Sequence, residues 1–135
     1  MIVDAEEKFY CKPDAGRLLV SPADETPVPA SDVQAEELDV AVAIDRLEQL
    51  TTLDVHRLHT KWAGLRSFVK DRSPVVGYDS AAPGFFWMAA LGGYGIQTAP
   101  ALGKVAAALL LDRPISRDML QFGVDAETLS AQRLR

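Results

Sequence analysis

The chain has 135 residues, of which 48% are hydrophobic and 24% charged, and its mean hydropathy is +0.02. These values are ordinary for a globular domain that can bury a core. An isoelectric point near 4.9, a net charge of −5 and the lack of a basic run argue against nucleic-acid binding. Charge is uneven, because residues 1–60 carry 13 acidic and 5 basic side chains and residues 61–135 carry 6 acidic and 9 basic. An anionic ligand would therefore bind more favourably to residues 61–135.

Targeting signals are not evident in the sequence. No run approaches the ~18 apolar residues of a membrane span, and the first residues, MIVDAEEK, lack the basic start and apolar core of a signal peptide. The single cysteine, Cys11, excludes an internal disulfide and fits a reducing compartment. We expect a cytoplasmic protein without a transmembrane segment, in which Cys11 is packed rather than reactive.

The first half of the chain predicts a β-hairpin and a helix. Residues 8–13 and 17–22 are rich in strand formers and flank Asp14-Ala15-Gly16, which is typical of a hairpin turn. A surface loop with prolines and acids follows. Capping-box spacing from Ser31 and a helical apolar stripe then predict a helix over residues 32–50. Residues 51–65, with β-branched and aromatic side chains, are expected to return to the sheet as a strand.

The second half predicts two more strands and the second helix. Residues 75–78 and 85–90 are the strands, and apolar residues spaced i, i+3, i+4, i+7 and i+8 from Leu102 predict a helix over about 98–111. The remainder, from residue 115, is expected to be a short helix or turn with a mobile tail. The sum is an α+β fold with a mixed, largely antiparallel sheet and two main helices.

A glycine loop lies between the last strand and this helix. Gly92, Gly93 and Gly95 permit positive φ and let a ligand approach the backbone without a Cβ in the way. The helix that follows would offer unpaired N–H groups and a positive partial charge, which suit an anionic or electron-rich group. A turn that only reverses the chain is the alternative.

Few residues offer ordinary catalytic chemistry. The two histidines, His56 and His59, fall on opposite faces of the expected strand, and no Cys or His cluster has metal-ligand spacing. We interpret both histidines as structural or solvent-facing. Arg66, at the end of the apolar segment 62–66, could bind a carboxylate through both arms of its guanidinium, or it could form a surface ion pair.

Several segments together resemble a known family. The features are GLRSFV at 64–69, Asp71, Pro74 and Gly77, GGYGIQT at 92–98 with Ala99-Pro100, the hairpin FYCKPDAG at 9–16, residues 19–26 and the tail 129–134. They resemble the C-terminal part of the D-amino-acid oxidase superfamily of FAD-dependent oxidoreductases, and within it the bacterial D-arginine dehydrogenases and related D-amino-acid dehydrogenases. The likeness covers nearly the whole chain.

This resemblance implies a flavin enzyme that transfers a hydride from the Cα of a D-amino acid to FAD, so that the imino acid formed hydrolyses to a keto acid and ammonia. Arg66 would bind the substrate carboxylate, Tyr10 would add a hydrogen bond to it, and the carbonyl of Gly93 would face the substrate amine. No residue is assigned a catalytic role and no metal is implied. The residues implied to line the flavin ring are Gly92, Gly93, Tyr94, Gly95, Ile96, Gln97 and Thr98.

Three departures from the family pattern matter. Leu91 stands where relatives commonly have a polar residue, and Lys70-Asp71-Arg72 replaces Pro-Asp-Gly. No G-x-G-x-x-G is present, since Gly93-Tyr94-Gly95 is followed by Ile96-Gln97-Thr98. We therefore expect the nucleotide-binding half to precede residue 1. FAD should be bound in the complete enzyme, and the isolated chain should show little activity.

The predicted organisation is a single domain, residues 1–135. Residues 1–90 would belong to the substrate domain, 91–114 would form the flavin-contacting loop and helix, and 115–135 the tail. The expected partners are a D-amino acid, an N-terminal FAD-binding polypeptide and further copies of the chain, which would cover apolar surface on the helix at 98–111. The alternative is a non-catalytic binding or assembly module that has lost the flavin, so whether the chain is itself an enzyme stays open.

Overall fold

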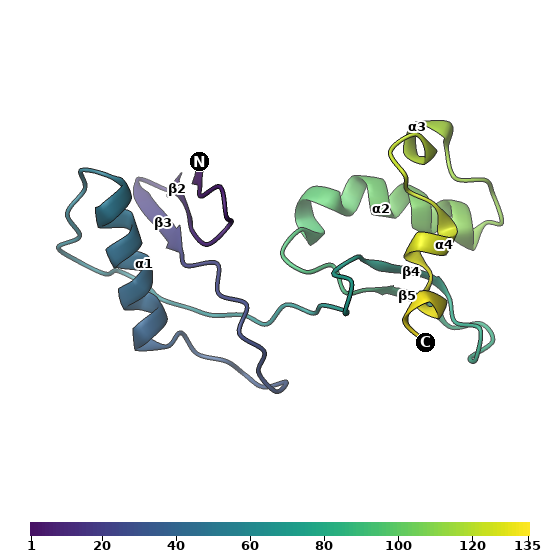
Figure 1. The fold of residues 1–135 in the computed structure, drawn as a ribbon, viewed down its shortest axis with the longest axis horizontal. Coiled ribbons are helices and arrows are strands. Elements are labelled where there is room, and N and C mark those ends of the chain that lie inside the picture. Colours follow the sequence, from purple (N-terminus) through teal and green to yellow (C-terminus); the bar gives the residue numbers. More distant parts are fainter. The chain divides into compact units, whose positions relative to one another are not determined.

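The computed structural model describes residues 1–135, which fold as two compact units, Met1–Leu65 and Arg66–Arg135 (Figure 1). Each unit has its own antiparallel sheet and one main helix. The α+β class with two main helices is confirmed, and its strands form two separate sheets of three and two strands. No helix combines the length and apolar character that crossing a membrane requires.

The first unit begins with a three-stranded antiparallel sheet in the order β1 (Ile2–Val3), β2 (Tyr10–Asp14) and β3 (Arg17–Ser21). The predicted hairpin is confirmed, with Asp14 opposite Arg17 at its end. Ala15 and Gly16 form the two-residue turn, and both have positive φ, at 47° and 75°. Such a turn matches the twist of antiparallel strands, which explains the register.

Helix α1 (Glu37–Leu50) packs on this sheet. Leu47 joins Phe9 and Cys11 in a core cluster whose members are at most 3% exposed, so Cys11 is packed as predicted. The helix starts five residues later than residue 32. The Ser31 hydroxyl donates to the Pro29 carbonyl instead of capping the helix, so the predicted capping box does not form.

The predicted strand at 51–65 is wrong, because residues 53–65 have no regular secondary structure. Local side chains take up the backbone groups that a strand would present to a neighbour. The Thr51 hydroxyl donates to the Leu47 carbonyl at 2.7 Å and accepts from the Leu53 N–H at 3.2 Å. The Val55 N–H donates to the Glu48 carboxylate at 2.9 Å.

The second unit pairs β4 (Val75–Tyr78) with β5 (Phe86–Ala89) in the antiparallel sense and packs α2 (Gly95–Leu110) against β4. Both predicted strands are confirmed within one residue. Val76 at 0% exposure and Val105 at 1% form the centre of its core. Helix α2 starts three residues earlier than predicted, because Thr98 closes the first turn by donating its N–H and its hydroxyl to the Tyr94 carbonyl, at 3.0 and 2.7 Å.

The C-terminal segment contains α3 (Arg117–Leu120), α4 (Ala126–Leu129) and a 3-10 helix, η1 (Ala131–Leu134). The prediction of a mobile tail is wrong, since Leu129 is 7% exposed and belongs to the core, while α4 and η1 both contact β4. Asp125 caps α4 by accepting the Thr128 N–H at 2.7 Å.

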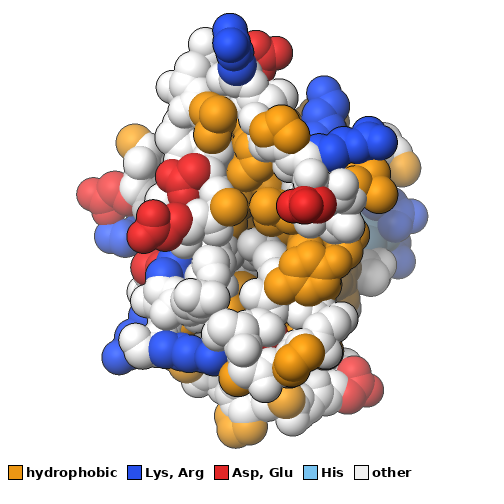
Figure 2. Space-filling view, turned by 90° about the vertical axis from the view of Figure 1, so that its right-hand side faces the viewer, with side chains coloured by type: hydrophobic (Ala, Val, Ile, Leu, Met, Phe, Trp, Pro, Cys, Tyr) orange, Lys and Arg blue, Asp and Glu red, His pale blue; other side chains and the backbone are white.

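Large apolar side chains remain at the surface of this unit. Figure 2 shows hydrophobic side chains gathered in the middle of one face, with charged groups around them. The most exposed large apolar residues of the second unit are Ile96 at 95%, Phe122 at 80% and Leu111 at 59%.

Acid stability of the second unit should depend on Asp79. Its carboxylate accepts three hydrogen bonds, from the Trp87 indole N–H at 2.8 Å, the Ala81 N–H at 2.7 Å and the Arg135 guanidinium at 2.6 Å. These bonds lower the pKa of Asp79 to about 2. Because the folded pKa is lowered, the stabilisation is complete above the ordinary carboxyl value of 3.8 and is lost as the pH falls toward 2.

We expect Asp79→Asn to flatten the dependence of unfolding free energy on pH between about 4 and 2, measured by urea unfolding with tryptophan fluorescence in a Trp62→Phe background, which leaves only Trp87. Asp118→Asn is the control, because Asp118 is an exposed carboxylate in the first turn of α3. An unchanged pH dependence in Asp79→Asn would contradict this assignment.

Candidate functional site

The glycine loop turns the chain from β5 into α2. Ala90 and Gly92 have positive φ, at 57° and 55°, and the Tyr94 N–H donates to the Leu91 carbonyl at 3.2 Å. Helix α2 begins at the next residue, Gly95, where a Cβ would lie 3.2 Å from that of Leu91. The predicted loop at 92–98 is thus a turn at Gly92–Tyr94 followed by the first turn of α2.

Residues 66–68 lie directly beside this turn. The Gly92 N–H donates to the Ser67 carbonyl at 3.1 Å, and a Cβ at Gly92 would be 2.7 Å from Phe68 Cε1. A Cβ at Gly93 would be 3.0 Å from Arg66 Nη1. We call the group formed by Arg66, Phe68, Gly92, Gly93 and the first turn of α2 the glycine corner. The structure thereby brings together Arg66 and the glycines that the sequence singled out.

The Phe68 ring orients two cations. The guanidinium carbon of Arg66 lies 5.4 Å from the ring centroid and that of Arg72 lies 4.8 Å from it, both within cation–π range. The sequence analysis assigned neither the Phe68 ring nor the Arg72 guanidinium to the site. Phe68 stood within the family-like segment 64–69, whereas Arg72 was noted only as part of Lys70-Asp71-Arg72, which departs from the family pattern.

The electrostatics of the corner favour anions. The first N–H groups of an α-helix have no partner within the helix and carry its positive partial charge. Tyr94 supplies no side-chain cap to α2, and the first turn holds no acidic residue. The Arg66 guanidinium adds a full positive charge beside Gly93, whose backbone is exposed. The arrangement can hold a carboxylate or an electron-rich carbonyl edge.

The other predicted cofactor residues extend along the start of α2. Tyr94 is 45% exposed and Ile96 is 95% exposed, and Gln97 is exposed as well. Thr98 is half-buried and its hydroxyl is engaged with the Tyr94 carbonyl. The exposed side chains leave this end of α2 open to a ligand, and Thr98 stabilises the helix start.

Tyr10, the other predicted substrate residue, opens β2 in the first unit. It is half-buried and pairs with Val3 on one side and Ser21 on the other. Because Tyr10 and Arg66 belong to different units, their meeting at one carboxylate stays a prediction.

The histidines lie in the irregular segment 53–65 and are both exposed, as expected of solvent-facing residues. His56 Nε2 is 3.7 Å from the Asp54 carboxylate, with both side chains more than three-quarters exposed. No three His, Cys, Asp or Glu side chains are grouped so that they could hold a metal ion.

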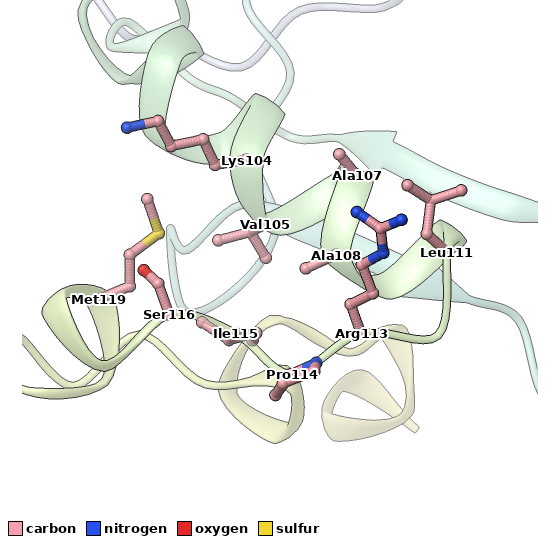
Figure 3. Close-up of a pocket in the computed structure, with 10 residues that line it drawn as sticks. All are labelled: Lys104, Val105, Ala107, Ala108, Leu111, Arg113, Pro114, Ile115, Ser116 and Met119. Atoms are coloured by element: carbon pink, nitrogen blue, oxygen red, sulfur yellow. The ribbon is translucent and has the colours of Figure 1, made fainter.

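A separate groove of about 340 Å³ lies along the second half of α2 (Figure 3). Its walls are mainly apolar, from Ala108 on α2 and Leu111 just after it to Ile115 and Met119, with Lys104 and Arg113 also lining it. None of the predicted site residues lines this groove, so it is distinct from the glycine corner.

Comparison with protein-family models matches residues 1–109 to the family described as FAD dependent oxidoreductase (DAO). The match covers the sheet of the first unit, the glycine corner and all but the last residue of α2.

Proposed function

Because this chain belongs to the family of FAD-dependent oxidoreductases, we propose that it forms the substrate-binding part of an enzyme that oxidises D-amino acids, of the D-arginine dehydrogenase kind. The reaction would move a hydride from the substrate Cα to the flavin, and the imino acid released would hydrolyse to a keto acid and ammonia. The chain would act as the C-terminal segment of the complete enzyme.

The observation that carries this proposal is the approach of Arg66 to Gly93, where a Cβ would lie 3.0 Å from the guanidinium. A guanidinium can donate two parallel hydrogen bonds to a carboxylate. The Gly93 carbonyl could then accept from the amino group of the same molecule, since the two groups of an α-amino acid are separated by one carbon. Tyr10 would donate a further hydrogen bond to the carboxylate from the first unit.

The residues present fit one edge of a flavin. The backbone at Gly93 is exposed and carries no side chain of its own, and the first turn of α2 offers N–H donors with no acidic residue in that turn. Residues 92–98 would hold the ring. When bound, the flavin would accept the hydride. The chain's own contribution would be to orient the substrate carboxylate at Arg66 and to present the α2 N–H groups to the electron-rich edge of the ring.

An N-terminal FAD-binding polypeptide is the proposed partner, because none of the 135 residues forms a G-x-G-x-x-G loop for the pyrophosphate. The second candidate function is a non-catalytic binding or assembly module that has lost the flavin. Leu91 favours it, since this apolar side chain packs on the core cluster of the second unit where relatives commonly have a polar residue near the ring.

The test compares residues 1–135 alone with the same residues joined to a family member's nucleotide-binding half. We expect no flavin absorbance and no dye reduction by D-amino acids from residues 1–135 alone, because one edge of the ring offers too few contacts to offset the entropy lost on binding. The completed protein should show both. Yellow, active protein from residues 1–135 would contradict the proposed division, and a completed protein that binds flavin but oxidises no D-amino acid would favour the second candidate.

We also propose that copies of the chain associate through apolar surface near α2. Ile96, Leu110 and Leu111 are between 49% and 95% exposed. Their burial would contribute a favourable free energy on assembly. Light scattering at increasing concentration should give the mass of a dimer or larger species, and a mass of 14.7 kDa at every concentration would refute the proposal.

A further inference from the structure

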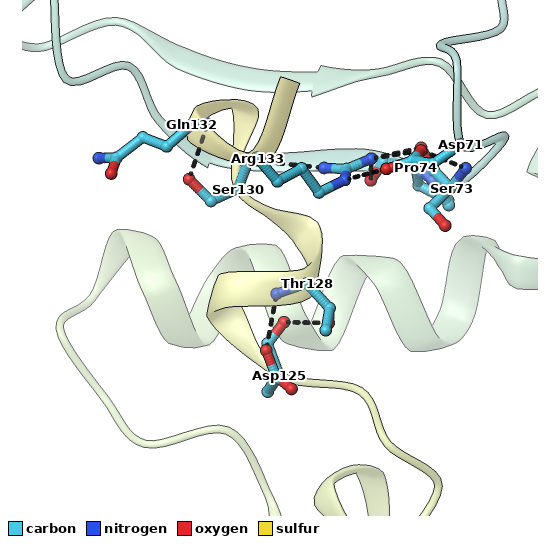
Figure 4. A network of polar contacts seen from close by, with 8 residues as sticks. All are labelled: Asp71, Ser73, Pro74, Asp125, Thr128, Ser130, Gln132 and Arg133. Atoms are coloured by element: carbon cyan, nitrogen blue, oxygen red, sulfur yellow. Dashed lines mark hydrogen bonds and ion pairs between the residues drawn. The ribbon is translucent and has the colours of Figure 1, made fainter. Parts of the chain in front are cut away.

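One arginine of the C-terminal 3-10 helix joins that helix to the turn before β4 (Figure 4). Arg133 Nε donates to Asp71 Oδ2 at 2.7 Å, and Arg133 Nη2 donates to Asp71 Oδ1 at 3.2 Å. The Arg133 side chain is only 15% exposed. Asp71 is 42% exposed, so the pair is bidentate and shielded from water mainly on the arginine side, which makes it stronger than a fully exposed ion pair.

The same guanidinium also holds three backbone carbonyls. Nη2 donates to the carbonyls of Ser73 and Pro74, at 2.7 and 3.1 Å, and Nη1 donates to that of Ser130 at 2.9 Å. Nη2 carries two hydrogens and also faces Asp71 Oδ1, so its three acceptors share them, and a lysine ammonium cannot reproduce this planar arrangement. Arg133 thus fixes both the carboxylate and the backbone of the segment that leads into β4.

This anchored segment is continuous with the glycine corner. The Arg72 N–H donates to the Val69 carbonyl at 2.9 Å, and Asp71 Oδ1 accepts the Ser73 N–H at 3.0 Å, so residues 69–73 form a closed turn. Phe68 precedes that turn directly and packs against Gly92. A shift of Asp71 would therefore move the Phe68 ring.

Regular secondary structure does not hold the corner from this side. Residues 53–69 contain no helix or strand, and Arg66, Ser67 and Arg72 are all exposed. The backbone bond from Gly92 to Ser67 and the cation–π contacts to Phe68 are individually weak when exposed. The bidentate pair of Arg133 and Asp71 is a firmer attachment that lies close to Phe68 in the chain.

We propose that Arg133 is a positioning residue for the glycine corner: by anchoring Asp71 it keeps Phe68 and Arg66 against Gly92 and Gly93. Arg133 lies outside residues 1–109, the part that matches the family. The expected effect on carboxylate binding rests on the function proposed above, whereas the effect on geometry does not.

The experiment follows the full chain by NMR. We expect nuclear Overhauser contacts between the Phe68 ring and Gly92 in the wild type, and their loss in both Arg133→Ala and Asp71→Asn. Arg133→Lys should retain them only in part. Arg135→Ala is the matched control, because Arg135 also ties the tail to the sheet but does so through Asp79 and Ser80, at 2.6 and 2.9 Å.

Contacts between Val76 and Val105 report whether the core of the unit is intact. If Arg133→Ala loses them, Asp71→Asn decides the question, because it leaves the arginine bonds to the Ser73 and Pro74 carbonyls in place. If the contacts from Phe68 to Gly92 persist in Arg133→Ala or Asp71→Asn while the core of that variant is intact, the proposal is overturned. An equal loss in Arg135→Ala would also overturn it, since any loosening of the tail would then suffice.

A titration with propionate, followed at the Arg66 Nε and Gly93 N–H signals, tests the link to function. We expect Arg133→Ala to weaken propionate binding about tenfold, and the effect should vanish in an Arg66→Ala background. If the wild-type signals do not respond to propionate, Arg66 is not a carboxylate site and the proposed function fails. The Overhauser contacts would still decide whether Arg133 positions Phe68.

Discussion

Arg66→Ala is expected to lower kcat/KM for D-amino acids on the order of 100-fold in the completed enzyme, while the flavin content stays unchanged. The reason is that removal of a guanidinium leaves the substrate carboxylate without its charged, bidentate partner. The loss should be measured by dye reduction over a range of substrate concentrations, with flavin absorbance recorded on the same samples. Arg66 lies outside residues 92–98, the segment proposed to hold the ring, so substrate use and flavin content should respond differently to its removal.

Two further variants sharpen this result. Arg66→Lys keeps the charge but loses the fork, so its kcat/KM should fall between those of the wild type and Arg66→Ala. Arg113→Ala removes an exposed arginine near the far end of α2 and should leave kcat/KM unchanged. Wild-type kinetics in Arg66→Ala would exclude the carboxylate role, and a parallel loss of flavin would show that Arg66 supports the cofactor instead.

Elements governed by local signals could be predicted from the sequence. The turn at Ala15-Gly16 fixes the hairpin because both residues adopt positive φ, and its two strands follow from it. The apolar spacing from Leu102 to Leu109 predicts the buried face of α2 because that face packs against β4. In these places local propensity and tertiary packing favour the same structure.

Elements in which local and distant hydrogen-bond partners compete could not be predicted from the sequence. Residues 51–65 have strand-forming side chains, but Thr51 and Glu48 take up the nearby N–H groups and no sheet edge pairs with the segment. The helix predicted from residue 32 fails at its start because Ser31 bonds to Pro29. The tail is ordered by Arg133, whose partner Asp71 lies 62 residues away, and sequence spacing carries no signal of such a pair.

The candidate site divides in the same way. Gly92 and Gly93 could be singled out from the loop, and Arg66 from its place at the end of an apolar segment, but their approach results from the bond between Gly92 and Ser67. Phe68 is the side chain that occupies the space which a Cβ at Gly92 would fill, and a glycine at position 92 is a signal of such a close neighbour. Which side chain that neighbour is can be identified only once the two segments are known to lie together.

Gly92→Ala is expected to destabilise the second unit by about 2 kcal/mol. Its φ of 55° is left-handed, which costs a residue with a Cβ roughly 1–2 kcal/mol. The new methyl would lie 2.7 Å from Phe68 Cε1, so the ring must move and lose packing against the turn. Urea unfolding followed by tryptophan fluorescence in a Trp62→Phe background measures the loss, and the same variant should weaken the Overhauser contacts from Phe68 to residue 92.

Gly103→Ala is the matched control within the same unit. Gly103 is in the interior of α2, has no left-handed φ and has nothing within 4 Å of an added Cβ. Alanine there should stabilise the helix by about 0.5–1 kcal/mol, because glycine is a poor helix former. The same substitution at two glycines is thus expected to act in opposite directions. If Gly92→Ala were neutral while Gly103→Ala stabilised as expected, the close contact between Gly92 and Phe68 would have to be discarded, and with it the geometry that brings Arg66 to Gly93.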